Sequence, residues 1–228
     1  MLARTIARQI VIALLALTSS LSFAYTLVDT NPSWDGSSGI SPFGNPNTAT
    51  YGQIVTVPAG ESSLTGFSFQ INDGGTAFPL RGEVYAWDSV NSRATGAALY
   101  ESPVTSTAGV NGFRALSFTP SIAVAAGQQY VIFATVSRDP AVGTSTWGLL
   151  ANNTAYPGGQ MVFLNNGANV ALWLTSSWAL VPLDLAFTVQ FGVLSAIAPV
   201  PTLSQWMLML LSVLMAGTVF VVMRRQIR

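Results

Sequence analysis

The segment Leu185–Val193, with the sequence LAFTVQFGV, alternates apolar and polar side chains in the manner of a β-strand. Phe187, Val189 and Phe191 fall on one face, and the polar residues between them fall on the other. A period of two residues is expected where one face of a sheet packs on a core. The segment therefore predicts a half-buried antiparallel strand.

The segment Leu80–Trp87 repeats this pattern, because Val84 and Ala86 share one face while Glu83, Tyr85 and Trp87 share the other. Similar short runs of β-branched and aromatic residues recur between turn signals, and no amphipathic helix separates them. We expect an all-β fold, an antiparallel β-sandwich with jelly-roll-like connectivity. The predicted strands are Gln53–Val57, Leu64–Ile71, Leu80–Trp87, Ala98–Val104, Phe113–Phe118, Tyr130–Val136, Thr146–Leu150, Met161–Leu164 and Leu185–Val193.

The composition changes along the chain and suggests five segments. Residues 25–52 are rich in Pro, Gly, Ser and Asn and predict an extended lead-in, with one early strand near Tyr25–Val28. The predicted organisation is a signal peptide at 1–24, this lead-in, the β-sandwich at 53–194, a spacer at 195–199 and a C-terminal tail at 200–228.

Charge is sparse and unevenly placed. Only 8% of the 228 residues are charged, against about 25% in an ordinary soluble domain. All nine acidic residues lie between Asp29 and Asp184, and only four arginines lie among them, so this region carries a net charge of −5. An acidic region without a basic stripe argues against nucleic acid as a partner.

Three residue types are missing, and their absence restricts the available chemistry. The chain has no Cys, no His and no Lys, so thiolate, imidazole and Schiff-base catalysis are excluded, and we expect no transition-metal site and no cofactor. A glycosidase needs only two carboxyl groups. Most of the available acids fit turns or solvent-facing positions, so we predict no catalytic residue. These acids are Glu61, Asp73, Glu83, Asp88 and Glu101.

The N-terminus has the pattern of a secretory signal peptide. Arg4 and Arg8 precede the apolar run Ile10–Leu17, and small residues at the −3 and −1 positions predict cleavage between Ala24 and Tyr25. The alternative is an uncleaved anchor, but the apolar run is shorter than the roughly 20 residues of a spanning helix. We therefore expect export by Sec-type machinery.

The C-terminus carries a second hydrophobic signal. Residues 206–223 are uniformly apolar or small, which is long enough for one transmembrane helix. Arg224, Arg225 and Arg228 follow directly, and by the positive-inside rule they act as a membrane stop on the cytoplasmic side.

A short motif precedes this helix, at Val200, Pro201, Thr202, Leu203 and Trp206. Together with the helix and the arginines it resembles the IPTL-CTERM sorting signal of Gram-negative bacteria, whose usual form is Ile-Pro-Thr-Leu-x-x-Trp-Gly. Here Val200 replaces Ile and Met207 replaces Gly. The resemblance implies processing by an exosortase-type enzyme. The alternative is a plain membrane anchor.

A second resemblance covers roughly Gln53 to Phe191. It rests on Val84–Asp88, Arg93–Gly96, Leu99–Pro103, Phe113, Leu116–Phe118 and Gly127–Val131. These runs resemble an uncharacterised β-rich domain of bacterial exported proteins that carry such tails. The resemblance implies the architecture and the localisation, but no activity.

Aromatic and oxygen-rich residues suggest two kinds of binding site. Exposed tryptophans stack on sugar rings, and the candidate glycan contacts are Trp87, Trp147, Trp173 and Trp178, with Trp34 a further tryptophan of the same region. The alternative is that these rings fill the core. The runs Asn72–Gly75 and Asp88–Asn91 resemble calcium loops, but each has one carboxylate and fits a tight turn equally well.

The sequence thus predicts an exported, envelope-anchored, non-catalytic β-domain protein of the cell surface or extracellular matrix. Its expected partners are the export machinery, an exosortase-type enzyme, the membrane and, in one alternative, a polysaccharide. That alternative is a carbohydrate-binding module for exopolysaccharide or another glycan. A carboxylate-based glycosidase is the third hypothesis.

Overall fold

The computed structural model describes residues 25–45, 48–140, 143–151 and 155–193, together with 209–210, 212–213, 215–217 and 223–224. The chain divides into two compact units, Met1–Leu194 and Ser195–Arg228. The predicted signal peptide, its cleavage site at Ala24, the spacer and the sorting motif lie outside the described residues.

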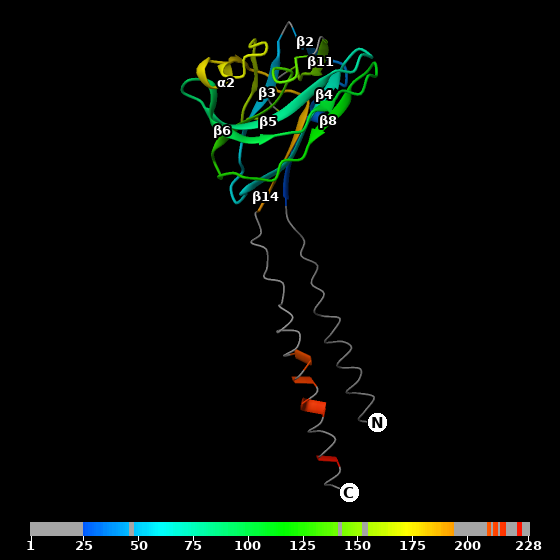
Figure 1. Ribbon diagram of the computed structural model, residues 1–228, viewed down its shortest axis with the longest axis vertical. Coiled ribbons are helices and arrows are strands. Elements are labelled where there is room, and N and C mark those ends of the chain that lie inside the picture. Colours follow the sequence, from blue (N-terminus) through cyan, green and yellow to red (C-terminus); the bar gives the residue numbers. More distant parts are fainter. Residues whose placement is uncertain are drawn as a thin grey trace. The chain divides into compact units, whose positions relative to one another are not determined.

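The first unit contains two antiparallel sheets (Figure 1). The first sheet has the order β1-β14-β4-β11-β2. In addition, β8 and β9 each pair with β4. Its strands are β1 (Tyr25–Asp29), β2 (Gly39–Phe43), β4 (Ser63–Asn72), β8 (Arg114–Phe118), β9 (Ile122–Ala123), β11 (Ser145–Gly148) and β14 (Phe187–Gly192).

The second sheet has the order β13-β12-β3-β10-β5-β6, and β7 pairs with β5. Its strands are β3 (Thr50–Thr56), β5 (Pro79–Asp88), β6 (Arg93–Glu101), β7 (Thr105–Ser106), β10 (Gln129–Thr135), β12 (Met161–Leu164) and β13 (Ala179–Val181). Two short helices complete the described part of this unit, η1 (Asn31–Ser33) and α2 (Leu172–Thr175).

Both sheets bury their inward-facing side chains in one hydrophobic core. Phe187, Val189 and Phe191 of β14 are fully buried there, and Leu80 and Val84 of β5 reach the same core from the second sheet. The residues that alternation placed on one face of Leu185–Val193 therefore lie together in the core. The prediction of a nearly all-β fold with antiparallel sheets is confirmed, while the jelly-roll connectivity stays a prediction.

Each predicted strand overlaps an observed one, but three features differ. The strand β6 begins five residues earlier than expected, because its Arg93–Gly96 start has the composition of a turn. Residues 25–45, predicted as a lead-in with one early strand, supply both β1 and β2 to the first sheet. The strands β7, β9 and β13, which have two or three residues each, were not predicted, because they are too short to show a period in the sequence.

The outer face of the second sheet is also buried, although alternation predicts a solvent-facing surface there. The segment 165–178, which contains α2, lies over this face and brings Trp173 and Trp178 onto it. These rings pack with Tyr85 of β5 and Phe133 of β10 in a second hydrophobic cluster. The strand β5 is therefore buried on both faces because a loop covers its outer side.

The strand β4 extends from one end of the sandwich to the other. Its first residue, Ser63, pairs with Gly192, which also pairs with Tyr25, so the chain enters and leaves this unit at one end. Its last residue, Asn72, lies next to β11 at the opposite end (Figure 1). Ten extended residues span about 30 Å, which separates the two ends.

Candidate functional site

The predicted sorting tail is described only at a few helical positions. Residues 209–210, 212–213, 215–217 and 223–224 are helical, and Arg224 is the one residue of the predicted membrane stop among them. Within the described part of the chain, no helix has the length and apolar character needed to cross a membrane. The transmembrane helix at 206–223 and the membrane-stop role of Arg224, Arg225 and Arg228 therefore stay predictions.

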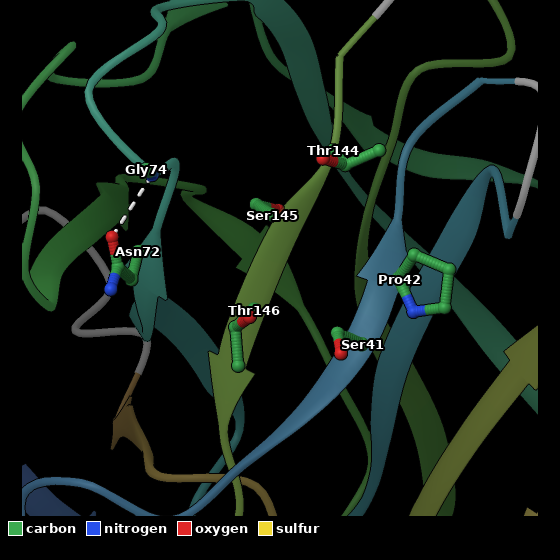
Figure 2. A pocket seen from close by; sticks show the side chains of 7 residues that line it. All are labelled: Ser41, Pro42, Asn72, Gly74, Thr144, Ser145 and Thr146. Carbon is green, nitrogen blue, oxygen red and sulfur yellow. Dashed lines mark hydrogen bonds between the residues drawn. The ribbon is translucent and has the colours of Figure 1, made fainter.

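A groove lies on the first sheet at the end formed by β2 and β11 (Figure 2). It has a volume of about 270 Å³. Three segments that are distant in sequence line it: the strand β2, the turn after β4, and β11 with the residue before it. The lining residues are Ser41, Pro42, Asn72, Gly74, Thr144, Ser145 and Thr146.

The groove is lined by hydroxyl and amide groups, most of which have no protein partner. Within the described residues, the hydroxyls of Ser41, Thr144 and Thr146 make no hydrogen bond. The Oδ1 atom of Asn72 accepts hydrogen bonds from the backbone N–H groups of Gly74 and Gly112, each at 3.0 Å. This fixes the orientation of the Asn72 amide and leaves its NH₂ group as a donor.

Phe113 lies next to Thr146 of the groove, Trp34 lies next to Phe113, and each ring packs over a glycine. Gly39 of β2 and Gly148 of β11 are paired in register, and neither has a side chain to raise the surface. A Cβ on Gly39 would lie 2.6 Å from Thr146 Cγ2 and 3.3 Å from Phe113 Cζ, and a Cβ on Gly148 would lie 3.0 Å from Trp34 Cζ2. The rings therefore rest directly on the backbone.

Trp34 and Phe113 contact one another and remain partly exposed. Their centroids are 4.8 Å apart with an interplanar angle of 84°, an edge-to-face arrangement. Trp34 Nε1 donates to the carbonyl of Ser38 at 2.7 Å, which fixes the indole. Since Phe113 and Thr146 meet over Gly39, the aromatic pair continues the wall of the groove.

The turn that forms one side of the groove is stabilised by hydrogen bonds to the carboxylate of Asp73, which belongs to the turn. The carboxylate of Asp73 accepts hydrogen bonds from the backbone N–H groups of Gly75, at 3.0 Å, and Gly109, at 2.7 Å. Burial raises the pKa of Asp73, but hydrogen bonds from Thr107, Gly109, Gly75 and Val110 outweigh it and lower the pKa below its usual value. The carboxylate of this calcium-like run thus serves the turn.

The second calcium-like run is a turn of the same kind. Asp88 accepts the N–H groups of Val90 and Asn91 through Oδ1, and the Asn91 amide through Oδ2. Several hydrogen bonds lower the pKa of Asp88, and the one from the Asn91 side chain has the largest effect. Among the described residues, no group of three or more acidic side chains gathers in a way that suits a metal ion.

All four tryptophans predicted as glycan contacts are buried, with exposed fractions between 0% and 8%. Trp147 lies in the core between the sheets, 4.8 Å from the rings of Phe43 and Phe69. Trp87, Trp173 and Trp178 form the cluster on the outer face of the second sheet. Stacking on a sugar requires an exposed ring face, and among the described tryptophans Trp34 alone keeps a partly exposed ring.

Two of the candidate carboxylates meet on the second sheet. Glu83 and Glu101 are paired in register on β5 and β6, and Arg138 binds both, at 2.6 Å to Glu83 Oε1 and 3.3 Å to Glu101 Oε2. Arg81 extends this cluster to Glu101 and Asp139. The Arg138 guanidinium also lies 5.1 Å from the centre of the Trp173 ring, within the range of a cation–π contact.

Glu83 is the most perturbed acid of this cluster. Its side chain is 0% exposed, and burial raises its pKa to about 7 despite the hydrogen bond and charge of Arg138. A glycosidase places two carboxyl groups on either side of the bond that is cut. Here a guanidinium joins the two carboxyl groups, so the geometry fits an ion-pair cluster better than a hydrolytic site.

Glu61 lies elsewhere, at the end of the sandwich where the chain enters and leaves. Its Oε1 atom accepts a hydrogen bond of 2.5 Å from the hydroxyl of Thr26 in β1. The five acids considered from the sequence therefore lie in different places. Asp73 and Asp88 stabilise turns, Glu61 contacts β1, and Glu83 and Glu101 belong to the arginine cluster.

Sequence reasoning missed the groove because its residues come from segments that no local pattern connects. Ser41 and Pro42 fall in the predicted lead-in, and Thr144 precedes a predicted strand. The run Asn72–Gly75 was noticed as a turn, but nothing in the sequence indicates that β2 and β11 lie beside it. Only the sheet order brings these groups together.

Comparison with known proteins supports the tail directly. Residues 198–225 match the family model described as the IPTL-CTERM motif, so the resemblance predicted from Val200–Trp206 and the apolar run is confirmed. The chain carries this C-terminal sorting motif. No curated protein matches the chain in sequence.

Among solved structures, two of Cwp84 from Clostridium difficile are similar to this chain. One holds the cysteine protease and lectin-like domains of that surface-layer-associated protein, with 14% identity, a TM-score of 0.41, and 64% of this chain and 32% of that chain covered. The other is the clostridial cysteine protease Cwp84 after propeptide cleavage, with 14% identity, a TM-score of 0.47, and 74% and 40% covered. The chain thus spans about a third to two fifths of those structures.

Proposed function

We propose that this chain is an exported, non-catalytic surface protein whose β-sandwich is delivered to the cell envelope through its C-terminal sorting motif. The observation that carries the proposal is the match of residues 198–225 to the IPTL-CTERM motif. The signal-peptide pattern of residues 1–24 supplies the matching entry into the export pathway.

In this proposal the motif and the apolar run have separate tasks. Pro201 fixes its own φ angle and biases Val200 toward an extended conformation, which a processing enzyme can bind as a strand-like peptide. Residues 206–223 would span the membrane, and Arg224, Arg225 and Arg228 would hold the end in the cytoplasm. The motif would then sit at a fixed depth for an exosortase-type enzyme.

The start of the sandwich suits the proposed cleavage of the signal peptide. The strand β1 begins at Tyr25 and pairs through Asp29 with β14. Cleavage between Ala24 and Tyr25 would therefore leave the whole of β1 in the mature chain.

The sorting role is tested by changing the motif without changing its hydrophobic context. The double variant Thr202→Ala with Leu203→Ala should lose processing, and the full-length form should accumulate in the inner membrane. A matched control is Ser204→Ala with Gln205→Ala, because these positions are variable in the motif. Immunoblots of fractionated cells compare the size and location of the three proteins.

The two hypotheses for the tail predict different blots. A sorting signal requires that the first variant differ from wild type while the control behaves as wild type. If all three proteins have the same size and location, the tail is a plain anchor and the proposal of enzymatic sorting is wrong.

A carbohydrate-binding module is the second candidate, and the groove on the first sheet favours it. Neutral hydroxyl and amide groups beside partly exposed aromatic rings suit a sugar better than they suit bond-breaking chemistry. A glycosidase remains the third, and it would have to use the Glu83–Glu101 pair in a geometry that frees both carboxyl groups from Arg138.

A further inference from the structure

We propose that the groove between β2, β11 and the turn after β4 binds a neutral hexopyranose unit of a polysaccharide, with Phe113 and Trp34 as its aromatic border. The inference deepens the proposed function by naming a ligand class for the surface domain. Its biological setting rests on that function, but the binding itself is a property of the folded sandwich.

The polar lining matches the hydrogen-bonding needs of a sugar. A hexopyranose presents several hydroxyl groups that each donate and accept, and hydroxyl side chains also do both. Ser41, Thr144 and Thr146 supply three such groups without a protein partner among the described residues, and the Asn72 NH₂ group supplies a donor. The groove can thus exchange water for sugar hydroxyls without breaking an internal hydrogen bond.

The absence of charge in the lining selects a neutral ligand. None of the residues that line the groove carries a charge. The nearest acid in sequence, Asp73, already accepts hydrogen bonds from the backbone N–H groups of Gly75 and Gly109. An anionic sugar would lose its hydration in this groove without gaining a cation from the lining residues, which is costly. A neutral ring has no such penalty.

The aromatic border supplies the apolar half of the recognition. The C–H faces of a pyranose are apolar and pack against aromatic rings. Phe113 meets Thr146 over the paired glycines, and Trp34 lies against Phe113. A sugar ring hydrogen-bonded to the Thr146 hydroxyl would therefore have Phe113 beside it. The next unit of an oligosaccharide would reach Trp34.

The position of the groove leaves it accessible. It lies at the Asn72 end of β4, whereas the chain enters and leaves the sandwich at the Ser63 end, about 30 Å away. Ser41 and Thr144 are exposed, so a ligand can reach the lining from solvent.

An extended peptide is the competing occupant, since β2 is an edge strand of the first sheet. Pro42 lies within β2 and has no N–H to donate, so it interrupts any added strand. The edge therefore disfavours strand addition, and a peptide becomes an outcome that the test separates.

Binding is measured by calorimetry on the full chain in a zwitterionic detergent, because alkyl glycoside detergents carry sugar headgroups. The neutral probes are cellopentaose, mannopentaose and laminaripentaose. A galacturonate pentamer serves as the charged probe, and an uncharged extended pentapeptide serves as the strand probe. We expect saturable binding of at least one neutral pentasaccharide and weaker binding of the other two probes.

The variants then locate the binding site. Thr146→Val keeps the methyl group that packs on Gly39 and replaces the hydroxyl with a second methyl group, and Ser41→Ala removes a second hydroxyl. Together the two substitutions should weaken the binding of the neutral sugar by about tenfold or more, which is the effect of losing two hydrogen bonds. Ser117→Ala is the matched control, because Ser117 is an exposed hydroxyl on the same face of the first sheet. It should bind as wild type.

Circular dichroism confirms that each variant retains the wild-type denaturation midpoint. The proposal is overturned if no neutral sugar binds, if the charged or peptide probe binds more tightly than every neutral sugar, or if the double variant binds as wild type. These outcomes leave the sorting proposal untouched, because that proposal is measured in cells through the size and location of the tail variants.

Discussion

The outer faces of the two sheets contain similar residue types, but they are used in opposite ways. On the second sheet, the segment 165–178 lies over the strands, and Trp173 and Trp178 pack with Phe133 in a closed cluster. On the first sheet, Trp34 lies on Gly148 at a partly exposed site beside an open groove. The difference lies in what covers each ring: a loop closes over Trp173 and Trp178, whereas Trp34 keeps a partly exposed face.

Polar groups follow the same division. The hydroxyl of Thr50 on the second sheet donates to Asn166 Oδ1 at 2.9 Å and accepts from Trp173 Nε1 at 3.2 Å. The hydroxyls of Ser41 and Thr146 on the first sheet have no such partner in the described part of the chain. The buried Thr50 hydroxyl is thus satisfied within the fold, whereas the more open hydroxyls of Ser41 and Thr146 are left for water or a ligand.

The largest difference is expected when one tryptophan is removed from each face. Trp173→Ala should lower the free energy of unfolding by about 3–5 kcal/mol, because it empties a closed cluster and leaves Thr50 without its donor. Trp34→Ala should cost clearly less, since the ring is already partly exposed. Denaturant unfolding followed by circular dichroism measures both. Equal losses would mean that Trp34 is a core residue and that the two faces do not differ.

The second prediction concerns the pH dependence of the covered face. Glu83 has a pKa of about 7 in the folded chain and an ordinary value near 4.5. Between these values the folded chain binds more protons than the unfolded chain, so stability falls as the pH rises. The shift corresponds to about 3 kcal/mol, which is fully present below pH 4.5 and lost above pH 7.

The variant Glu83→Gln tests this directly, because Gln imitates the protonated side chain. Its denaturation midpoint should change much less than that of wild type between pH 4.5 and 7.5. Some change should persist, since burial also raises the pKa of Asp184. Glu101→Gln is the control from the same cluster, and it should retain the wild-type fall. A wild-type midpoint that rises over this range contradicts the burial of a protonated Glu83.

The sequence allowed the strands to be predicted, but it did not show how they are covered. Alternation in Leu185–Val193 identified Phe187, Val189 and Phe191 as inward residues because a single sheet face decides that pattern. The same reasoning assigned Tyr85 and Trp87 to a separate face and gave no sign that a loop 80 residues later buries them. A covering loop leaves no period in the strand beneath it.

The candidate site shows this limit more strongly. The tail motif was predictable because it is contiguous and its order is specific. The groove was not, because Ser41, Asn72 and Thr146 meet only through the pairing of β2, β11 and β4. Four of the five tryptophans considered for sugar contact proved to be buried, and composition alone cannot distinguish a core indole from an exposed one.

The smallest expected effect comes from one chemical change made on both faces, the replacement of a threonine hydroxyl by a methyl group. Thr50→Val should destabilise the fold by about 1–3 kcal/mol, because Trp173 Nε1 and Asn166 Oδ1 lose a partner away from water. Thr146→Val should stay within about 0.5 kcal/mol of wild type, since its hydroxyl has no partner among the described residues and Val keeps the methyl contact with Gly39. Denaturation midpoints of the two variants, measured side by side at one pH, give the comparison. If Thr146→Val proved as damaging as Thr50→Val, the Thr146 hydroxyl would be part of the fold's own hydrogen bonding. The groove would then lose the group on which its use as a binding site most depends.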